Sequence, residues 1–133
     1  DVVIDCSDNF NTRYALNRIC VKLRKPLVSG AAIGFEGQIT VYDFRHDDSP
    51  CYHCLFPATG ESSDARCANN GVFAPLVGMI GTAQAAEAMK LLMNIGTSLE
   101  GRLLLLDALA MEWRTMRLCK DSKCPECNIT SPA

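Results

Sequence analysis

The sequence has no excess of charge of either sign, and this absence argues against two classes of partner. It carries 13 lysines and arginines against 15 aspartates and glutamates, a formal net charge of −2. Nucleic acids and anionic bilayers attract proteins through clustered positive charge. We therefore expect neither a nucleic acid nor a membrane as a partner.

An uninterrupted apolar run long enough to span a bilayer is also missing. The most apolar stretch, residues 71–93, is broken by Thr82, Gln84, Glu87 and Lys90, which predicts that it is not a membrane-spanning helix. Residues 1–5 carry neither the basic segment nor the cleavage site of a secretion signal. They are strand-like from the first residue, so we expect the chain to start inside a domain.

Glycine-rich phosphate-binding motifs are absent too. The nine glycines form neither the G-x-G-x-x-G fingerprint nor a P-loop. A nucleotide-binding site is therefore not expected to be complete within these residues.

What is present is typical of an ordered domain. The chain has 133 residues, of which 48% are hydrophobic and 21% charged, so it is too apolar for a disordered segment. Its length predicts one domain, or one piece of a larger domain, over residues 1–133.

The first third of the chain has the pattern of a parallel α/β unit. Residues 2–4 form a short apolar run, and Leu16, Ile19, Cys20 and Leu23 then follow with helical spacing. A second strand is expected over residues 26–32. A strand, a helix and a strand in this order predict a parallel pair within a doubly wound α/β sheet.

Further elements are predicted downstream. Residues 38–42 alternate as a strand covered on one face, and residues 75–94 form a helix opened by Pro75 and closed by Gly96. We expect Gln84, Glu87 and Lys90 to be its water-facing stripe. Strands over 102–107 and 113–118 are expected to pair antiparallel. Residues 45–70 lack apolar periodicity, which predicts a functional or mobile loop. We expect the least order in this loop at residues 58–70.

Four of the eight cysteines form two C-x-x-C pairs. The pairs are Cys51 with Cys54 and Cys124 with Cys127, and this spacing lets both thiolates of a pair reach one tetrahedral Zn²⁺. We predict a closed, structural zinc site. The alternatives are disulfides or a redox pair, and neither pair stands at the start of an evident helix. His53 is a rival ligand that we expect to point away.

This placement of cysteines also bears on the compartment. Paired C-x-x-C motifs are more typical of metal sites than of a disulfide framework, and a reducing environment suits them best. We therefore expect a cytoplasmic protein.

A polar cluster at the end of the first strand is a candidate cation site. Asp5-Cys6-Ser7-Asp8-Asn9 stands where open α/β sheets bind ligands, and the Asp8 carboxylate suits Mg²⁺. The alternative is that Asp8 caps the following helix. Arg13, one turn into that helix, faces either phosphate or solvent.

Cys67 is a candidate nucleophile. It stands in a polar stretch directly after Arg66, and a nearby cation favours the thiolate form of an exposed cysteine. A surface cysteine without a role fits the same residues equally well.

Taken together, these motifs resemble those of the ThiF/MoeB/HesA family. The resemblance runs from Asp1 to about Asn128. It rests on D-C-S-D-N-x-x-x-R from Asp5, P-L-V-S-G-A-A-I-G-F-E-G-Q from Pro26, C-Y-H-C, the Cys67 to Gly71 stretch, A-P-L-V-G-M-I-G-T-A-Q-A-A-E-A-M-K from Ala74, and C-P-E-C. The family fold is a Rossmann-like α/β domain with a mixed sheet. The resemblance implies that this chain is the C-terminal half of such a domain, without the half that carries the glycine-rich turn.

The resemblance also implies a reaction. Family members use ATP to adenylate the C-terminal Gly-Gly carboxylate of a ubiquitin-like sulfur carrier, such as those of thiamine or molybdopterin pathways, and are usually homodimers. Asp8 and Asn9 would then bind Mg²⁺-ATP with Arg13 nearby, and Cys67 matches a loop cysteine that in some members bonds to the carrier. The four paired cysteines match the zinc ligands.

A different class of function fits the bare residues as well. A zinc-stabilised module that binds a carrier or dimerises without catalysing a reaction needs none of the missing nucleotide-binding residues. Without those residues, the fragment by itself is expected to be inactive even if the full-length protein is an adenylyltransferase.

Overall fold

The computed structural model describes residues 1–58 and 71–128 and forms an α/β fold built on a five-stranded sheet. The strand order is β1-β2-β3-β4-β5, which is also the order in the sequence. β1 (Val3–Asp5) and β2 (Pro26–Ile33) are parallel. β3 (Glu36–Asp43) is antiparallel to β2 and to β4 (Arg102–Asp107). β4 is also antiparallel to β5 (Glu112–Arg117). The sheet is therefore mixed, as expected.

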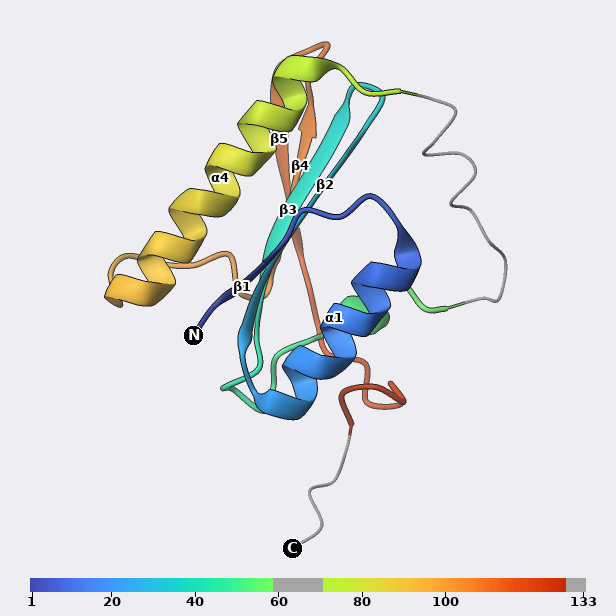
Figure 1. The fold of residues 1–133 in the computed structure, drawn as a ribbon, viewed down its shortest axis with the longest axis vertical. Helices are drawn as coiled ribbons and strands as arrows, with labels where there is room; N and C mark the ends of the chain where they lie inside the picture. The colour runs from blue at the N-terminus through green and yellow to red at the C-terminus, as the bar shows by residue number, and fades with distance from the viewer. Residues whose placement is uncertain (59–70, 129–133) are drawn as a thin grey trace, which may run out of the picture.

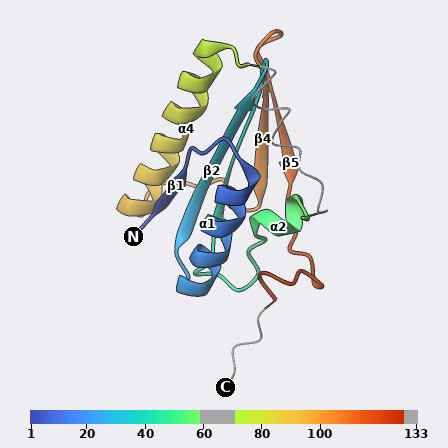
Figure 2. The same ribbon diagram turned by 45° about the vertical axis from the view of Figure 1, so that its right-hand side comes forward.

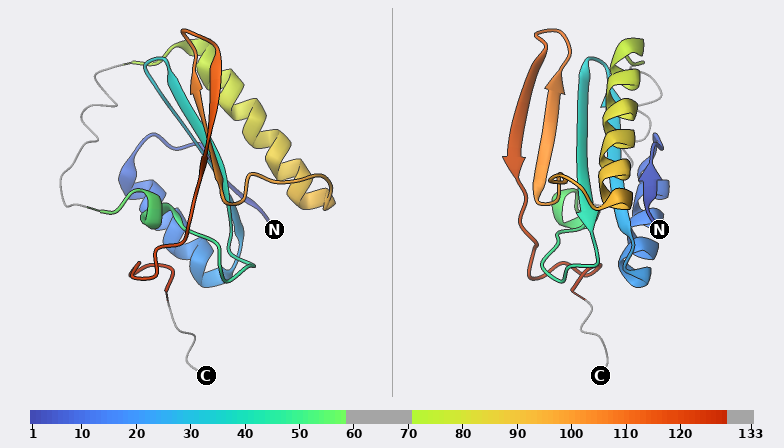
Figure 3. Two further views of the ribbon diagram at one scale, coloured as in Figure 1. Left: turned by 180° about the vertical axis from the view of Figure 1, so that it is seen from behind. Right: turned by 90° about the vertical axis from the view of Figure 1, so that its left-hand side faces the viewer.

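Helices lie on both faces of this sheet (Figure 1). The long helix α4 (Ala74–Met93) packs against β2 and β3 on one face. On the other face lie α1 (Phe10–Leu23) and the short helix α2 (Tyr52–Leu55). The views in Figures 2 and 3 show residues 119–128, called the C-terminal tail below, close to α2. Helices on both faces and the parallel β1–β2 pair confirm the predicted α/β class. The expectation of a doubly wound parallel sheet is wrong for these residues, because three of the four strand pairs are antiparallel.

The first connection follows the predicted strand, helix and strand. α1 begins at an N-cap formed by Asn9, whose Oδ1 accepts a hydrogen bond from Thr12 N at 2.8 Å. It ends at Arg24 in the left-handed conformation, with φ of 53°. Pro26 then opens β2, so the chain enters the second strand without a long loop.

α4 has the predicted length, but the face predicted to lie in water is the face that packs on the sheet. Gln84 and Glu87 are buried, whereas Val77, Met89 and Leu92 are exposed. The expectation that the polar stripe faces water is therefore wrong. The reason is that both polar side chains satisfy backbone groups: Gln84 Nε2 donates to Asp5 O at 2.8 Å, and Leu99 N donates to Glu87 Oε2 at 3.2 Å.

Two further expectations are corrected. β3 is buried on both faces from Ile39 to Asp43, because α4 covers one face and the α1 side covers the other. The segment after β3 is not wholly irregular, since α2 lies within it. Of the predicted loop at 58–70, residues 59–70 lie outside the described residues.

Three apolar clusters hold the layers together. Leu76 and Ile80 of α4 form one of them with Leu106 of β4. The other two contain more buried residues. One joins Val28, Ile39 and Val41 of the sheet to Ala88 of α4. The other, on the α1 side, is formed by buried side chains of the sheet, α1, α2 and the tail: Cys20, Leu27, Tyr42, Phe44, Cys51, Tyr52 and Cys124. Two cysteines of the C-x-x-C pairs are thus part of the core. Among the described helices, none is both long and apolar enough to cross a membrane.

Candidate functional site: a four-cysteine cluster beside a pocket

The two C-x-x-C pairs come together between α2 and the C-terminal tail. The sulfur of Cys51 lies 3.8 Å from that of Cys54 and 3.7 Å from that of Cys124, and Cys54 Sγ lies 3.4 Å from Cys127 Sγ. All four sulfurs are within 4.8 Å of one another. Tetrahedral zinc with Zn–S bonds of about 2.3 Å separates its sulfurs by about 3.8 Å. The cluster therefore has the geometry to hold one zinc ion.

The local fold explains why the pairs meet. Cys51 is the N-cap of α2 and Cys54 lies in its single turn, while Cys124 N donates to Asp121 O in a turn of the tail. The expectation that neither pair stands at the start of a helix is therefore wrong for the first pair. The seven cysteines that the structure describes are free of disulfide bonds.

The thiols differ in acidity. Burial raises the pKa of Cys51 to about 12, and burial together with the neighbouring Cys54 raises that of Cys127. Burial also disfavours the Cys54 thiolate, but hydrogen bonds from its surroundings outweigh burial and lower the pKa of Cys54. Because zinc binds thiolates, loading the cluster must displace protons, and zinc affinity should fall at low pH.

His53 does not point away from the cluster, contrary to expectation. Its Nδ1 lies 3.7 Å from Cys124 Sγ. The four sulfurs already suffice for a closed tetrahedral site, so His53 stands beside the cluster and outside the ligand set. Cys119, which follows β5, is exposed and does not belong to the cluster.

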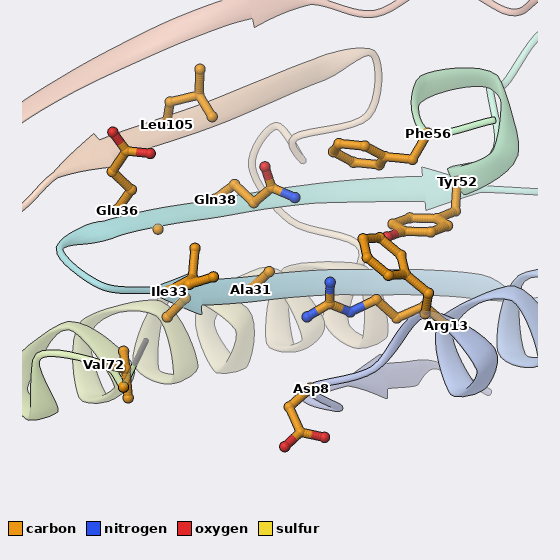
Figure 4. Close-up of a pocket in the computed structure, with 14 residues that line it drawn as sticks. Asp8, Arg13, Ala31, Ile33, Glu36, Gln38, Tyr52, Phe56, Val72 and Leu105 are labelled. Carbon is orange, nitrogen blue, oxygen red and sulfur yellow. The ribbon is translucent and has the colours of Figure 1, made fainter. Parts of the chain in front are cut away.

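A pocket of about 430 Å³ opens next to α2 on the same side of the sheet. Its walls come from several elements (Figure 4): Asp8 and Arg13 from the α1 region, Ala31 and Gln38 from the sheet, and Tyr52 and Phe56 at α2. The lining is mainly apolar with a few polar groups, which is typical of ligand pockets. α2 therefore contributes both to the cysteine cluster and to the pocket.

Asp8 is exposed at this pocket and does not cap α1. Asn9 fills the N-cap position, so the alternative reading of Asp8 as the cap is wrong. A weak contact from Asn9 Nδ2 to Asp8 Oδ1, at 3.4 Å, is the polar contact found for Asp8 among the described residues. The Asp8 carboxylate is thus available to a ligand.

Arg13 is anchored at the pocket wall. Its Nη2 donates to Ser7 O at 3.0 Å, and its guanidinium lies over the Phe10 ring at 5.8 Å. Its Nε is buried and has no hydrogen-bond partner within the described part of the chain. Ser7 is held in turn by Asp5, whose Oδ1 accepts from Ser7 N at 2.9 Å. Hydrogen bonds from Arg13 and to Asp5 therefore hold the loop before α1 in place.

The structure adds residues that the sequence did not single out. Gln38, Tyr52 and Phe56 line the pocket. In the sequence, Gln38 was a polar residue within an expected strand and Tyr52 an aromatic residue inside C-Y-H-C, whereas Phe56 had no signal. A second polar cluster, Asp43 with His46 and Glu100, lies within the reach of a cation, but Arg45 already pairs with Asp43 at 2.7 Å. The candidate nucleophile Cys67 lies outside the described residues.

Comparison with known proteins decides the family. The ThiF family profile matches residues 1–128. The chain belongs to the ThiF family. Adenylyltransferase and sulfurtransferase MOCS3 of Caenorhabditis briggsae is 47% identical over 99% of the chain, and MOCS3-1 of Zea mays is 48% identical over 96%. The match to this ThiF chain covers only 34% and 26% of these two relatives, respectively.

Solved structures agree on the fold. Escherichia coli MccB with ATP aligns to 96% of this chain and 40% of its own, with a TM-score of 0.76 and 16% identity. A heterocyclase in complex with substrate and cofactor aligns to 95% of this chain and 20% of its own, with a TM-score of 0.70 and 15% identity. Identities this low carry the fold and no more, and the fold is that expected of the ThiF family.

Proposed function

We propose that this chain forms part of an enzyme that uses ATP to adenylate the C-terminal Gly-Gly carboxylate of a ubiquitin-like sulfur carrier. The MOCS3 relatives are adenylyltransferases and sulfurtransferases by name, and the family assignment makes the same activity class the first expectation for the full-length protein. The chain spans about a third or less of those relatives, so it supplies one portion of the site.

The observation that carries the proposal is that Asp8 and Arg13 line one pocket. Asp8 is free of strong partners in the described chain and suits Mg²⁺, which takes one or two carboxylates and completes its shell with water and phosphate oxygens. Arg13 brings positive charge to the same wall, where it would favour a phosphate group. In this assignment, Asn9 fixes the start of α1 and orients Asp8 toward the Mg²⁺-ATP complex.

The remaining residues have supporting roles. The four-cysteine cluster would hold a structural zinc ion that fixes α2 at the pocket. The apolar part of the pocket, with Ala31, Tyr52 and Phe56, suits an extended glycine-rich segment better than a charged one. Cys67 is proposed as the loop cysteine that accepts the activated carrier or relays sulfur after adenylation. The full-length protein is proposed to be a cytoplasmic homodimer.

The test is ATP–pyrophosphate exchange by the full-length protein in the presence of its carrier. Asp8→Asn keeps the size of the side chain but removes its charge, and we expect exchange to fall by about 100-fold or more because the metal loses its protein ligand. Asp48→Asn is the matched control, since Asp48 is an exposed aspartate away from the pocket.

The outcomes separate the two classes of function. Loss of exchange with Asp8→Asn alone supports the proposal. Full exchange by Asp8→Asn would remove Asp8 from the reaction. A full-length protein that binds its carrier but shows no exchange at all would favour the zinc-stabilised binding module.

A further inference from the structure

His53 is held in a fixed position between α1 and the cysteine cluster. Its Nε2 accepts a hydrogen bond from Ala58 N at 3.4 Å, and its ring packs against Tyr14 with the ring centres 5.9 Å apart. Its other nitrogen, Nδ1, lies 3.7 Å from Cys124 Sγ. Each edge of the imidazole therefore has one neighbour of defined chemistry.

These contacts determine which nitrogen carries the proton. A neutral imidazole has one donor and one acceptor nitrogen. Because Nε2 accepts from a backbone N–H, the proton of the neutral ring is on Nδ1. That proton faces Cys124, so the neutral ring can donate a hydrogen bond from Nδ1–H to the sulfur.

Such a bond has a consequence at a zinc site. Four thiolates around Zn²⁺ leave a net charge of about −2, and Cys51 and Cys124 are buried, where uncompensated charge is costly. A hydrogen bond to a metal ligand withdraws charge from it and fixes its orientation, and loss of such a bond commonly weakens metal binding by about 10- to 100-fold.

We propose that His53 is a positioning residue of the zinc site, which donates a hydrogen bond from Nδ1 to the Cys124 thiolate and thereby slows the loss of zinc. It acts from outside the ligand set, because the four sulfurs complete the tetrahedron. Zinc retention in this sense is separate from adenylation and does not depend on the proposed function.

The same residue joins the metal site to the pocket. Tyr14, which packs on His53, donates from its hydroxyl to Phe56 O at 2.6 Å, and Phe56 lines the pocket. Cys51, His53 and Phe56 lie on or beside the single turn of α2. His53 is thus one of the contacts through which a zinc ion held by the four cysteines would fix the pocket wall.

The test measures zinc release from the zinc-loaded full-length protein to the chromogenic chelator 4-(2-pyridylazo)resorcinol at pH 7.5. His53→Phe keeps an aromatic ring against Tyr14 but removes the donor, and we expect zinc release to become about 10-fold faster or more. His53→Gln, whose amide N–H can still donate, should give a smaller increase. His46→Phe, at the exposed histidine beside Glu100, should match the wild type.

Cobalt substitution distinguishes a donor from a ligand. If His53 acts from outside the ligand set, the Co²⁺ forms of the wild type and of His53→Phe both show the absorption of a four-thiolate site. The bands of His53→Phe should be shifted in energy, because it has lost the hydrogen bond. A three-thiolate, one-nitrogen spectrum in the wild type would overturn the proposal, as would zinc release by His53→Phe within twofold of the wild type.

Two checks keep these results decisive. If His53→Phe does not fold, judged by circular dichroism, the rate for His53→Gln and the wild-type cobalt spectrum decide the question. A wild-type protein that binds no zinc would instead overturn the metal assignment on which the role of His53 rests, while leaving the adenylation proposal open to its own test.

Discussion

At the scale of single residues, His46 links two loops through charge. Its Nδ1 lies 2.8 Å from Glu100 Oε1 and 3.8 Å from Asp43 Oδ2. The hydrogen bond to Glu100, aided by the charges of Glu100 and Asp43, raises the pKa of His46. Asp43 stays ionised beside it: burial favours its neutral form, but the Arg45 guanidinium outweighs burial and lowers the pKa of that carboxyl.

A raised histidine pKa predicts a definite dependence on pH. The stabilisation is fully present below the pKa of the unfolded chain, about 6.5, and is lost as pH rises through the higher pKa of the folded state. Because the side chain is 56% exposed, we expect only about 0.5 kcal/mol. Urea unfolding should show that His46→Gln costs this much at pH 6.0 and nothing at pH 8.5.

Glu100→Gln serves as the matched control for this prediction. It removes the main cause of the raised His46 pKa while keeping a polar side chain. In a Glu100→Gln background, His46→Gln should therefore change the free energy of unfolding equally at pH 6.0 and pH 8.5. A cost of His46→Gln that is equal at both pH values would contradict the ion pair.

The sequence predicted these single-residue sites only in part. The spacing of the cysteines was sufficient to predict that the two pairs form one cluster, because tetrahedral zinc restricts where four sulfurs can lie. The roles of Asp8 and His53 were harder to predict. Whether Asp8 or Asn9 caps α1 depends on the backbone angles of two adjacent residues. The direction of the His53 side chain depends on the turn of α2. Neither is encoded in spacing along the chain.

At the scale of elements, the apolar pattern predicted the existence of α4 and its bounds to within one residue, but the predicted buried and exposed faces were reversed. A stripe of Gln84, Glu87 and Lys90 resembles a solvated face because polar side chains usually lie in water. In the fold, backbone carbonyls at Asp5 and Val28 and the N–H of Leu99 needed partners, and Gln84 and Glu87 supply them. Such demands arise from tertiary contacts and leave no periodic signal in the sequence.

This packing of α4 on β2 predicts a coupled pair. A Cβ at Gly30 would overlap the Gln84 side chain, so Gly30→Ala should lower the free energy of unfolding by about 1–3 kcal/mol. In a Gln84→Ala background the same change should cost at least about 1 kcal/mol less, because the obstructing amide is gone. Urea unfolding of the two single variants and the double variant measures this coupling.

Gly78→Ala is the matched control on the exposed side of α4, where an added Cβ meets nothing within 4 Å. Removing a helical glycine there should stabilise the protein by about 0.5–1 kcal/mol. Strictly additive costs for Gly30→Ala and Gln84→Ala would contradict the close approach of α4 to β2.

At the scale of the whole molecule, the cysteine cluster closes the chain on itself. Cys51 and Cys124 stand 73 positions apart, yet both belong to the apolar cluster that joins α1, the sheet, α2 and the tail. The opposite layer, with α4 on the sheet, has two apolar clusters of its own, and neither contains these cysteines. Zinc should therefore stabilise one face of the molecule much more than the other.

Removal of zinc should reveal this division. Chelation, or Cys124→Ser, should lower the free energy of unfolding by several kcal/mol, because metal binding energy is coupled to folding. Hydrogen exchange should accelerate in α1, α2 and residues 118–128, while α4 and its contacts with β2 stay protected. Cys119→Ser, at an exposed cysteine outside the cluster, should change neither measurement. Uniform acceleration across both faces would show that the layers unfold as one unit, and unchanged exchange would show that the cluster holds no structural metal.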